Sequence, residues 1–243
     1  MNRRLFAGLL ILLFLLSACG NTPASPSTTQ PPPVQTTLPP ETLPSETIPE
    51  TTPEIALPEP APENLVRVLD YIPGIFQELP YATDQNFTGQ VIYDFSDAYL
   101  RYGTVKKLAA VSEDLAQLGL ALKIWDGFRP VSAQFRLWEV CPDPAFVANP
   151  QKGYSAHSRG NTLDVTLADA QGRELEMPSG FDDFSPKADR DYTDCTEEAA
   201  QHAQLLEILM EKHGFQGYSA EWWHFSDTEE YPVAENFVPP SNN

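Results

Sequence analysis

The stretch Tyr154–Leu167, YSAHSRGNTLDVTL, joins a polar turn to a run in which apolar residues alternate with others. Successive side chains of a β-strand point to opposite faces, so the apolar residues would share one face and Asp164 would lie on the other. A buried carboxylate is costly without a partner. Gly160 allows a turn through which His157 folds back towards Asp164. The pair is either part of a metal site or an ordinary strand-end hydrogen bond.

A second cluster, SAEWWHFSD at Ser219–Asp227, sets Glu221 and His224 three residues apart in an aromatic stretch of high strand propensity. In such apolar surroundings these two side chains must be paired, neutralised or bound to something. Together with His157 and Asp164, His224 would complete three ligands that zinc accepts, with a fourth position for water. Glu221 would then serve as the base for that water. Alternatively, Glu221 and His224 only hydrogen-bond to each other at a core edge.

A third stretch, KIWDGFRP, contains Arg129 at the end of an apolar run, with Asp126 three residues earlier. The guanidinium could simply pair with Asp126. Beside a zinc-activated water it could instead stabilise the oxyanion of a tetrahedral intermediate. His202 and His213 fall on a predicted helix without a matching acidic cluster, so we leave both out of the site.

The remaining pattern predicts one α+β domain. Helical periodicity is clearest in segments 104–118, 130–140 and 197–213. Broken apolar runs at 64–72 and 79–93 indicate strands and loops, and the runs at 120–128 and 217–226 indicate strands. Gly119 and Gly214 follow two of the helices, and a capping box from Asp194 to Glu197 would start the third. Because helices and strands do not alternate regularly, we expect a mainly antiparallel central sheet flanked by helices.

Residues 1–19, MNRRLFAGLLILLFLLSAC, show two arginines, an apolar run and then small residues, which is typical of an export signal. The run is too short to span a bilayer comfortably. LSAC matches the bacterial lipobox, in which the cysteine carries a lipid. We therefore predict a lipoprotein signal peptide and lipidation of Cys19, which would anchor the exported protein to the outer face of the cell membrane. An ordinary secretory signal with a chance cysteine is the alternative.

Residues 20–64 are rich in proline, threonine and glutamate and lack lysine, arginine and aromatic residues. Such a composition does not build a packed core and favours an extended tether. A docking segment for a partner is the alternative interpretation. Residues 65–243 form the predicted catalytic domain, which carries most of the net charge of −19. This charge excludes nucleic acid as a partner, because phosphate binding requires the opposite sign.

Cys141 and Cys195 remain in the domain once Cys19 is set aside. An exported compartment would permit a disulfide between them, but the sequence does not show whether they come within bonding range. Two buried free thiols are the alternative, and both possibilities stay open.

The motifs resemble those of the zinc D-alanyl-D-alanine dipeptidases of the vancomycin-resistance (VanX) type, which are relatives of the zinc D,D-carboxypeptidases. The resemblance runs through LPYATDQNFTG, KIWDGFRP, LWEVCPDP, SAHSRGNTLDVTL, GFDDF and EWWHF. It implies a zinc-peptidase domain of the hedgehog and D,D-peptidase type with one Zn²⁺ ion. It also implies that His157, Asp164 and His224 bind the zinc, that Glu221 is the base and that Arg129 is the arginine of the family's D-x-Y-R-P pattern.

Substrate contacts also follow from the resemblance. Tyr81 and Asp182 match positions that would contact the amino end of the dipeptide, and Ser155 would help to hold its carboxylate. Asp183 is an equally acidic neighbour of Asp182.

Two residues depart from the family pattern. Thr162 stands where alanine is usual, and Phe128 stands where tyrosine is usual. The hydroxyl that Thr162 adds needs a hydrogen-bond partner, and the hydroxyl that Phe128 lacks could have oriented a neighbouring side chain. These departures concern substrate detail more than metal binding.

The resulting hypothesis is zinc-dependent hydrolysis of the D-Ala-D-Ala dipeptide. The lipobox is a further departure, because an exported copy could not reach newly made cytoplasmic dipeptide, so we expect a role in cell-wall peptide turnover or salvage rather than resistance. A D,D-carboxypeptidase that trims longer wall peptides is one alternative. A non-catalytic lipoprotein that binds wall fragments is the other, and the presence of Glu221 argues against it.

Overall fold

The computed structural model describes residues 59–144 and 146–242. The chain divides into two units, Met1–Ile55 and Ala56–Asn243, and all the described residues belong to the second unit. The predicted signal peptide, Cys19 and most of the predicted tether lie outside the described residues. Among those residues, we find no helix with the length and apolar character needed to cross a membrane.

The described chain contains a five-stranded sheet in the order β2-β4-β5-β7-β6 and a separate pair, β1 and β3. β2 pairs with β4 in parallel, and every other strand pair is antiparallel. The predicted mainly antiparallel α+β fold is therefore confirmed. The strands are β1 (Leu65–Arg67), β2 (Phe76–Gln77), β3 (Tyr99–Arg101), β4 (Leu120–Asp126), β5 (Thr162–Asp169), β6 (Phe215–Tyr218) and β7 (Glu221–Asp227).

All three predicted helices form. They are α1 (Tyr102–Gln117), α2 (Val131–Val140) and α3 (Glu197–Lys212), and the short 3₁₀ helices are η1 (Val68–Asp70), η2 (Pro80–Ala82), η3 (Ala156–Arg159) and η4 (Pro186–Ala188). Gly119 and Gly214 adopt positive φ angles just beyond α1 and α3, as glycine does most easily. α3 starts at Glu197 as predicted, but the capping residue expected from the capping box, Asp194, is wrong. Its N-cap is Thr196, whose hydroxyl accepts a hydrogen bond from Ala199 N at 3.1 Å.

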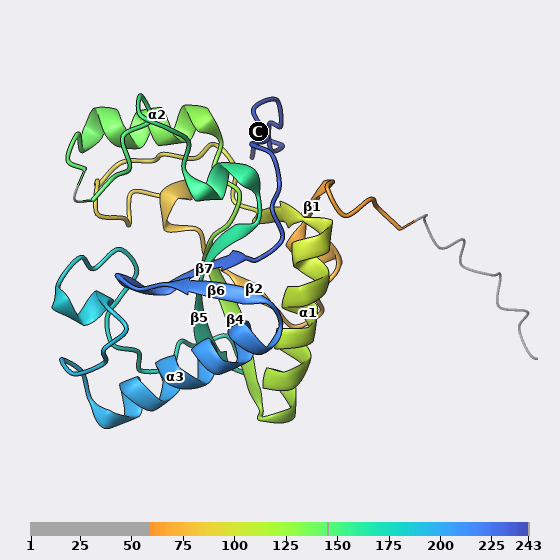
Figure 1. The fold of residues 1–243 in the computed structure, drawn as a ribbon, viewed down its shortest axis with the longest axis vertical. Coiled ribbons are helices and arrows are strands. Elements are labelled where there is room, and N and C mark those ends of the chain that lie inside the picture. The colour runs from red at the N-terminus through yellow and green to blue at the C-terminus, as the bar shows by residue number, and fades with distance from the viewer. Residues whose placement is uncertain (1–58, 145, 243) are drawn as a thin grey trace, which may run out of the picture. The chain divides into compact units, whose positions relative to one another are not determined.

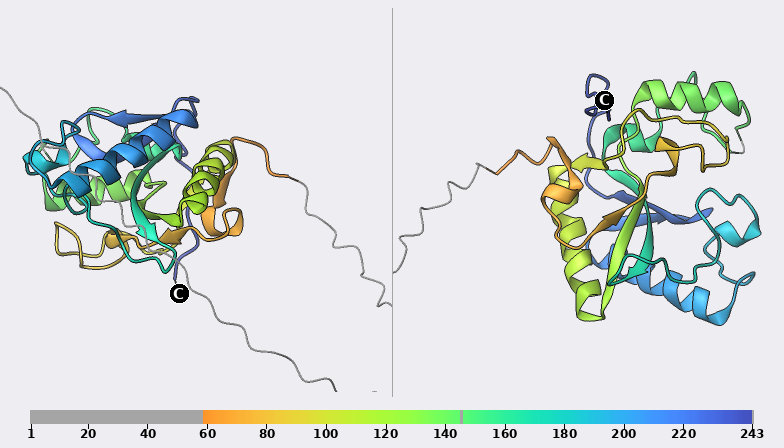
Figure 2. Two further views of the ribbon diagram at one scale, coloured as in Figure 1. Left: turned by 90° about the horizontal axis from the view of Figure 1, so that it is seen from below. Right: turned by 180° about the vertical axis from the view of Figure 1, so that it is seen from behind.

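α1 and α3 pack against the sheet and against each other, whereas α2 lies apart from them (Figure 1 and Figure 2). α1 buries residues at helical spacing, among them Val105, Leu108 and Leu115. Residues 162–168 of β5 are all buried. Both faces of β5 are thus covered, which means that the face carrying Asp164 lies in the interior as well.

The predicted strand at 217–226 is in fact a hairpin. Gly217 belongs to β6, and Ser219 and Ala220 form the turn into β7. A single strand was the simpler interpretation because the aromatic residues run almost continuously. The hairpin instead places Phe215 in the core and brings Glu221 to the very start of β7.

The last residues before 65 contact the domain. Pro62 O accepts a hydrogen bond from Gly103 N at 2.9 Å, and Asn64 O accepts one from Tyr102 N at 2.8 Å. These carbonyls satisfy N–H groups in the first turn of α1 that have no partner within the helix. The end of the segment interpreted as a tether therefore packs on the domain.

Cys141 and Cys195 are both free and half-buried, so the structure favours separate thiols over the disulfide. Outside the cavity described below, His202 Nδ1 contacts Glu176 O, and His213 Nε2 contacts Asp114 Oδ2 at 2.7 Å. Both histidines are thus engaged elsewhere, in agreement with their exclusion from the site.

Asp227 anchors the end of β7 to α1. Its buried carboxylate accepts hydrogen bonds from Thr104 Oγ1 at 2.8 Å and from Lys107 Nζ. We expect Asp227→Ala to lower the free energy of unfolding by about 2–3 kcal/mol, because the buried partners lose their acceptor. Urea denaturation measures this loss. Lys106→Ala, which removes an exposed ion pair to Glu59, is the control and should leave the stability nearly unchanged.

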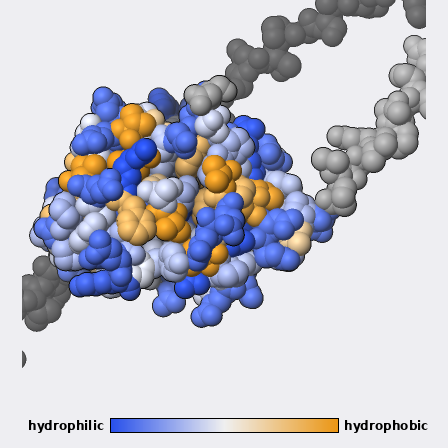
Figure 3. All heavy atoms as spheres, turned by 90° about the horizontal axis from the view of Figure 1, so that it is seen from above, coloured by the Kyte–Doolittle hydropathy of each residue, from blue (hydrophilic) through white to orange (hydrophobic). Residues whose placement is uncertain are grey.

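The face shown in Figure 3 is mainly hydrophilic, with interspersed apolar groups. Large apolar side chains that remain exposed include Phe135, Phe146 and Tyr154. Phe146 and Tyr154 line the cavity that holds the predicted site residues.

Candidate active site

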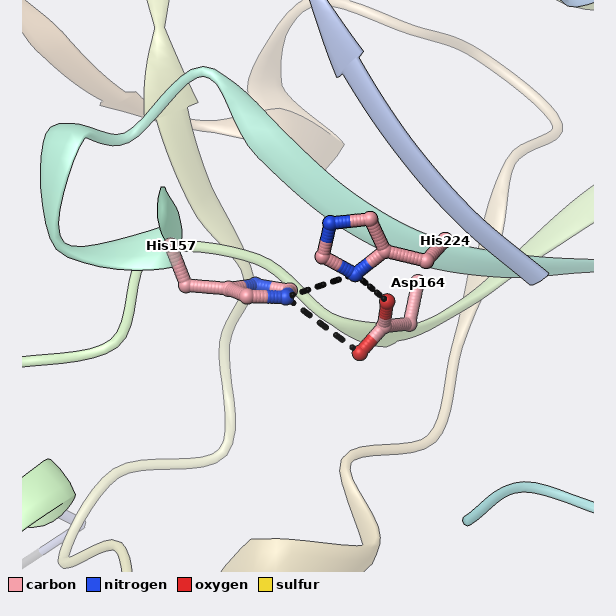
Figure 4. A group of neighbouring side chains, drawn as sticks. All are labelled: His157, Asp164 and His224. Atoms are coloured by element: carbon pink, nitrogen blue, oxygen red, sulfur yellow. Dashed lines mark hydrogen bonds and ion pairs between the residues drawn. The ribbon is translucent and has the colours of Figure 1, made fainter. Parts of the chain in front are cut away.

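Three predicted ligands meet at one point (Figure 4). His157 Nε2 lies 3.3 Å from His224 Nδ1 and 3.5 Å from Asp164 Oδ2, and His224 Nδ1 lies 3.0 Å from Asp164 Oδ1. Asp164 and His224 are direct partners in the pairing of β5 with β7. His157 arrives from η3, and Gly160, at φ +77°, makes the turn that leads into β5. The predicted fold-back of His157 onto Asp164 is confirmed.

Hydrogen bonds fix the orientation of the His157 ring. Its Nδ1 lies 2.9 Å from the carbonyl oxygen of Gly127, to which a neutral imidazole donates through Nδ1–H. The lone pair of Nε2 then faces His224 and Asp164. Burial lowers the pKa of His157 well below its usual value, and burial lowers the pKa of His224 to about 4. Both rings are therefore neutral near pH 7, as metal ligands must be.

The three residues fit a zinc ion. Ligand atoms at 2.0–2.1 Å from a tetrahedral zinc lie about 3.3–3.5 Å apart. The two imidazole nitrogens are separated by 3.3 Å, and each of them has one oxygen of Asp164 at 3.0 or 3.5 Å. Asp164 is buried, and its Oδ1 makes no hydrogen bond within the described residues despite its proximity to His224. Burial raises the pKa of Asp164 well above its usual value, which shows the cost of leaving this carboxylate without a cation. A cation at the centre would satisfy all three ligand atoms at once.

Glu221 stands beside the three ligands without joining them. Its Oε2 is 3.5 Å from His224 Nδ1, and its side chain remains 25% exposed. Burial, followed by the negative charge of Asp164, raises the pKa of the Glu221 carboxyl. A raised pKa brings a carboxylate closer to the range in which a general base both accepts and releases a proton.

Arg129 is held rigidly, and the two interpretations of its role are compatible. Its Nη2 and Nε donate to Asp126 Oδ2 at 2.7 and 3.1 Å, and its Nη1 donates to Gln134 Oε1 at 2.9 Å. Burial acts to lower its pKa, but the Asp126 carboxylate raises the pKa well above the usual value, so the charge is permanent. The guanidinium also lies over the Tyr81 ring, 5.3 Å from its centroid. Only some of its N–H groups are used, which leaves others for a substrate.

All eight predicted catalytic, metal and substrate residues line one cavity of about 400 Å³. They are Tyr81, Arg129, Ser155, His157, Asp164, Asp182, Glu221 and His224. These side chains come from five stretches that are distant in the sequence, of which residues 155–164 supply three side chains and residues 221–224 supply two. Their convergence is the tertiary result on which the functional argument depends.

Tyr81 and Asp182 close one side of the cavity. The Tyr81 hydroxyl donates to Asp182 Oδ2 at 2.6 Å. Asp182 has a φ angle of +52°, which is uncommon for a residue other than glycine, and burial raises the pKa of its carboxyl well above the usual value. Asp183 is exposed and accepts a hydrogen bond from Ser185 N. The geometry therefore favours Asp182 over its neighbour as the acidic residue of the site.

The two departures from the family pattern are accommodated outside the ligand set. Thr162 Oγ1 pairs with Ser226 Oγ at 2.9 Å across β5 and β7. The buried Phe128 ring packs against Phe237, 5.3 Å between centroids, and does not line the cavity. Neither change alters a ligand.

Sequence reasoning missed several residues of the site. The exposed Tyr218 ring packs edge-on against His224, 5.8 Å between centroids, and Phe146 and Phe184 form an aromatic part of the wall. The Gly127 carbonyl that orients His157 is a backbone group and leaves no mark in the sequence. Tyr218 adjoins the EWWHF motif, and that proximity was the only signal that could have drawn attention to it.

The fold and the site define a class of protein. An α+β domain with two imidazoles and a carboxylate around one point, and a separate glutamate beside them, has the arrangement of a metallopeptidase. Residues 62–240 match the model of the Peptidase_M15 family, described as D-ala-D-ala dipeptidase. The chain belongs to this family and is a hydrolase, as the resemblance in the sequence predicted.

Two curated relatives agree with this assignment. A D-alanyl-D-alanine dipeptidase of Escherichia coli (strain K12) is 38% identical over 174 residues, which cover 71% of this chain and 87% of the relative. One from Enterococcus faecalis (strain ATCC 700802 / V583) is 33% identical and covers 67% of this chain and 91% of the relative. A crystal structure of a mutant of VanY, a vancomycin-resistance D,D-pentapeptidase, in complex with Zn(II) shares 13% identity, with a TM-score of 0.37, over 54% of this chain and 74% of that one.

Proposed function

We propose that the domain hydrolyses the D-Ala-D-Ala dipeptide with one zinc ion held by His157, Asp164 and His224. The observation that carries this proposal is the meeting of these three ligand atoms, within 4.8 Å of one another, beside a glutamate that is not part of the set. The relatives that share 31–38% identity over most of their length are D-alanyl-D-alanine dipeptidases, which supports the same substrate here.

The residues divide the chemistry among them. Zinc bound at this site supplies Lewis acidity, which lowers the pKa of water and polarises a carbonyl group. Glu221 accepts the proton of the attacking water at a carboxylate oxygen and then delivers it to the nitrogen of the leaving amine. Arg129, fixed by Asp126 and Gln134, directs its remaining N–H groups at the negative charge that develops on the carbonyl oxygen.

The lining of the cavity also supports selection of a free dipeptide. Asp182 and Tyr81 place a carboxylate and a phenol where a substrate ammonium group would neutralise the buried negative charge. Ser155, buried in the cavity wall, is a hydrogen-bond partner for the substrate carboxylate. A peptide that is blocked at its amino end would leave Asp182 without a cation, which is unfavourable.

The deciding experiment compares free D-Ala-D-Ala with N-acetyl-D-Ala-D-Ala and with a pentapeptide that ends in D-Ala-D-Ala. We expect rapid release of alanine from the free dipeptide alone. Preferential cleavage of the pentapeptide would instead establish a D,D-carboxypeptidase. Binding of the dipeptide in a calorimeter without release of alanine would establish a non-catalytic binding protein.

Asp182→Asn should weaken selection for a free amino end. The amide keeps the size of the side chain but removes its charge, so we expect kcat/KM for D-Ala-D-Ala to fall about 10- to 100-fold, as loss of a charged hydrogen bond implies. The value for the N-acetylated dipeptide should change far less. Asp183→Asn is the matched control and should leave both values unchanged. An equal loss for both substrates would contradict this role of Asp182.

We further propose export and lipid anchoring through Cys19, with action on wall-derived dipeptide outside the cell membrane. The proposal rests on the lipobox LSAC and on the composition of residues 20–64. Mass spectrometry of the protein purified from membranes tests it. A mature chain that begins with acylated Cys19 is expected, and a full-length chain in the soluble fraction would contradict it.

A further inference from the structure

Arg190 lies in the loop between Asp182 and α3 and contacts the β6–β7 hairpin at several points. Its Nε donates to Tyr218 O at 2.8 Å, and its Nη2 donates to Trp222 O at 3.0 Å and to His224 O at 2.9 Å. Its backbone N–H also donates to Ser219 O at 3.2 Å. One residue thus binds four carbonyl groups of the hairpin that carries Glu221 and His224.

These carbonyls need a partner because the hairpin is irregular. Gly217 of β6 pairs with Phe225, but the next residue, Tyr218, pairs with Glu221. Within the described residues, residues 222–224 of β7 are therefore not paired with any residue of β6. Irregularities of this kind occur next to active sites, and His224, which lines the cavity, lies in the unpaired part of β7 on this side. The Arg190 guanidinium replaces the missing strand contacts on this side of β7.

The surroundings of Arg190 hold the guanidinium in place. It lies over the Phe225 ring, 4.4 Å from its centroid, and its Nη1 is 3.3 Å from Glu207 Oε1 of α3. Glu207 also accepts a hydrogen bond from the Tyr192 hydroxyl at 2.8 Å. The guanidinium is consequently held by Glu207 of α3, which is itself hydrogen-bonded to Tyr192 of the loop.

Gly217 makes room for this arrangement. A Cβ atom at this position would lie 2.4 Å from Cζ and 2.6 Å from Nη2 of Arg190, and its three nearest neighbours are all guanidinium atoms. Any larger residue at 217 would therefore push the guanidinium away. The position of the Arg190 guanidinium therefore requires glycine at position 217.

We infer that Arg190 is a positioning residue, which holds the hairpin so that His224 completes the metal site and Glu221 stands beside it. This inference rests on the proposed function, because it assigns Arg190 a role through those two residues. Arg190 does not line the cavity, and its hydrogen bonds act on the site through the backbone of β7. It also ties the loop that carries Asp182 to the hairpin.

The test measures metal binding rather than turnover alone. In Arg190→Met the stem remains but the donors are lost, and we expect the affinity for Zn²⁺, measured by competition with a chromophoric chelator, to fall about 10- to 100-fold. We also expect the visible absorption spectrum of the Co²⁺-substituted domain to change, because this spectrum reports the geometry of the ligands. Arg190→Lys, which retains one charged donor group, should recover part of the affinity.

Gly217→Ala provides an independent test that leaves every donor in the chain. It should reduce Zn²⁺ affinity in the same direction by displacing the guanidinium. In an Arg190→Met background the same change should have a much smaller effect, because the two atoms nearest to the new methyl group, Cζ and Nη2, are gone. Equal losses in both backgrounds would contradict the inference.

Arg136→Met is the control, since Arg136 also donates to a backbone carbonyl, Ile92 O at 2.8 Å, but away from the metal ligands. Its Zn²⁺ affinity and Co²⁺ spectrum should match those of the unmodified domain. If the unmodified domain binds no zinc, the proposed function fails. If it binds zinc and Arg190→Met binds it equally, with an unchanged Co²⁺ spectrum, the positioning role alone is overturned.

Discussion

Glu221→Gln is expected to lower kcat for D-Ala-D-Ala about 10²- to 10⁴-fold, the range that general acid–base catalysis contributes. The amide has nearly the shape of the carboxylate but does not accept a proton from water. Glu221 lies outside the three ligand atoms, so the variant should still bind one zinc ion. The effect should therefore fall on kcat, with a much smaller change in the affinity for the dipeptide.

Two measurements separate this result from a loss of structure. The zinc content of purified Glu221→Gln, determined by atomic emission, should equal that of the unmodified domain, and its unfolding temperature should be similar or slightly higher, because a partly buried carboxylate is removed. Glu230→Gln, at an exposed position beyond β7, is the control and should keep full activity. Undiminished turnover by Glu221→Gln would exclude Glu221 as the base.

Removal of zinc with a chelator is expected to abolish turnover and to lower the unfolding temperature. Without a cation, Asp164 is buried beside two neutral imidazoles. Burial raises the pKa of Asp164 and lowers the pKa of His157 and of His224, which means that the charged form of each group is unfavourable in the apo protein. A ligand present at about 1,000 times its Kd stabilises the native state by about 4 kcal/mol, so the shift should be large in calorimetry.

Addition of Zn²⁺ should restore both activity and stability. His157→Ala is the matched variant: it lacks one ligand, so its unfolding temperature should respond far less to chelator or to added zinc. A chelated domain with unchanged activity and an unchanged unfolding temperature would contradict a zinc site at His157, Asp164 and His224.

Much of the fold was predictable because its signals are local. The spacing of apolar residues such as Val105, Leu108 and Leu115 produces an amphipathic helix wherever that segment lies in the chain. The glycines that follow α1 and α3 end those helices through their own backbone freedom. By contrast, the cap of α3 depended on which of several polar residues met the helix, and Thr196 took the position assigned to Asp194.

The candidate site was predictable for a different reason. His157, Asp164, Glu221 and His224 carry chemistry that must appear in short motifs, because each motif fixes the direction of its side chains along one strand or turn. Arg190 belongs to no such motif. Its partners are backbone carbonyls of a distant hairpin. Because every residue has a backbone carbonyl, the sequence does not indicate which ones Arg190 binds.

The sequence by itself determined the helices, the β4 and β5 strands and the types of residue available for metal chemistry, since these depend on neighbours within a few positions. Only the tertiary structure decided that β5 is buried on both faces, that residues 217–226 form a hairpin and that Cys141 and Cys195 stay apart. Those outcomes depend on contacts between segments that lie far apart in the chain. The same contacts bring His157, Asp164 and His224 to within 4.8 Å of one another, which no single stretch of sequence can specify.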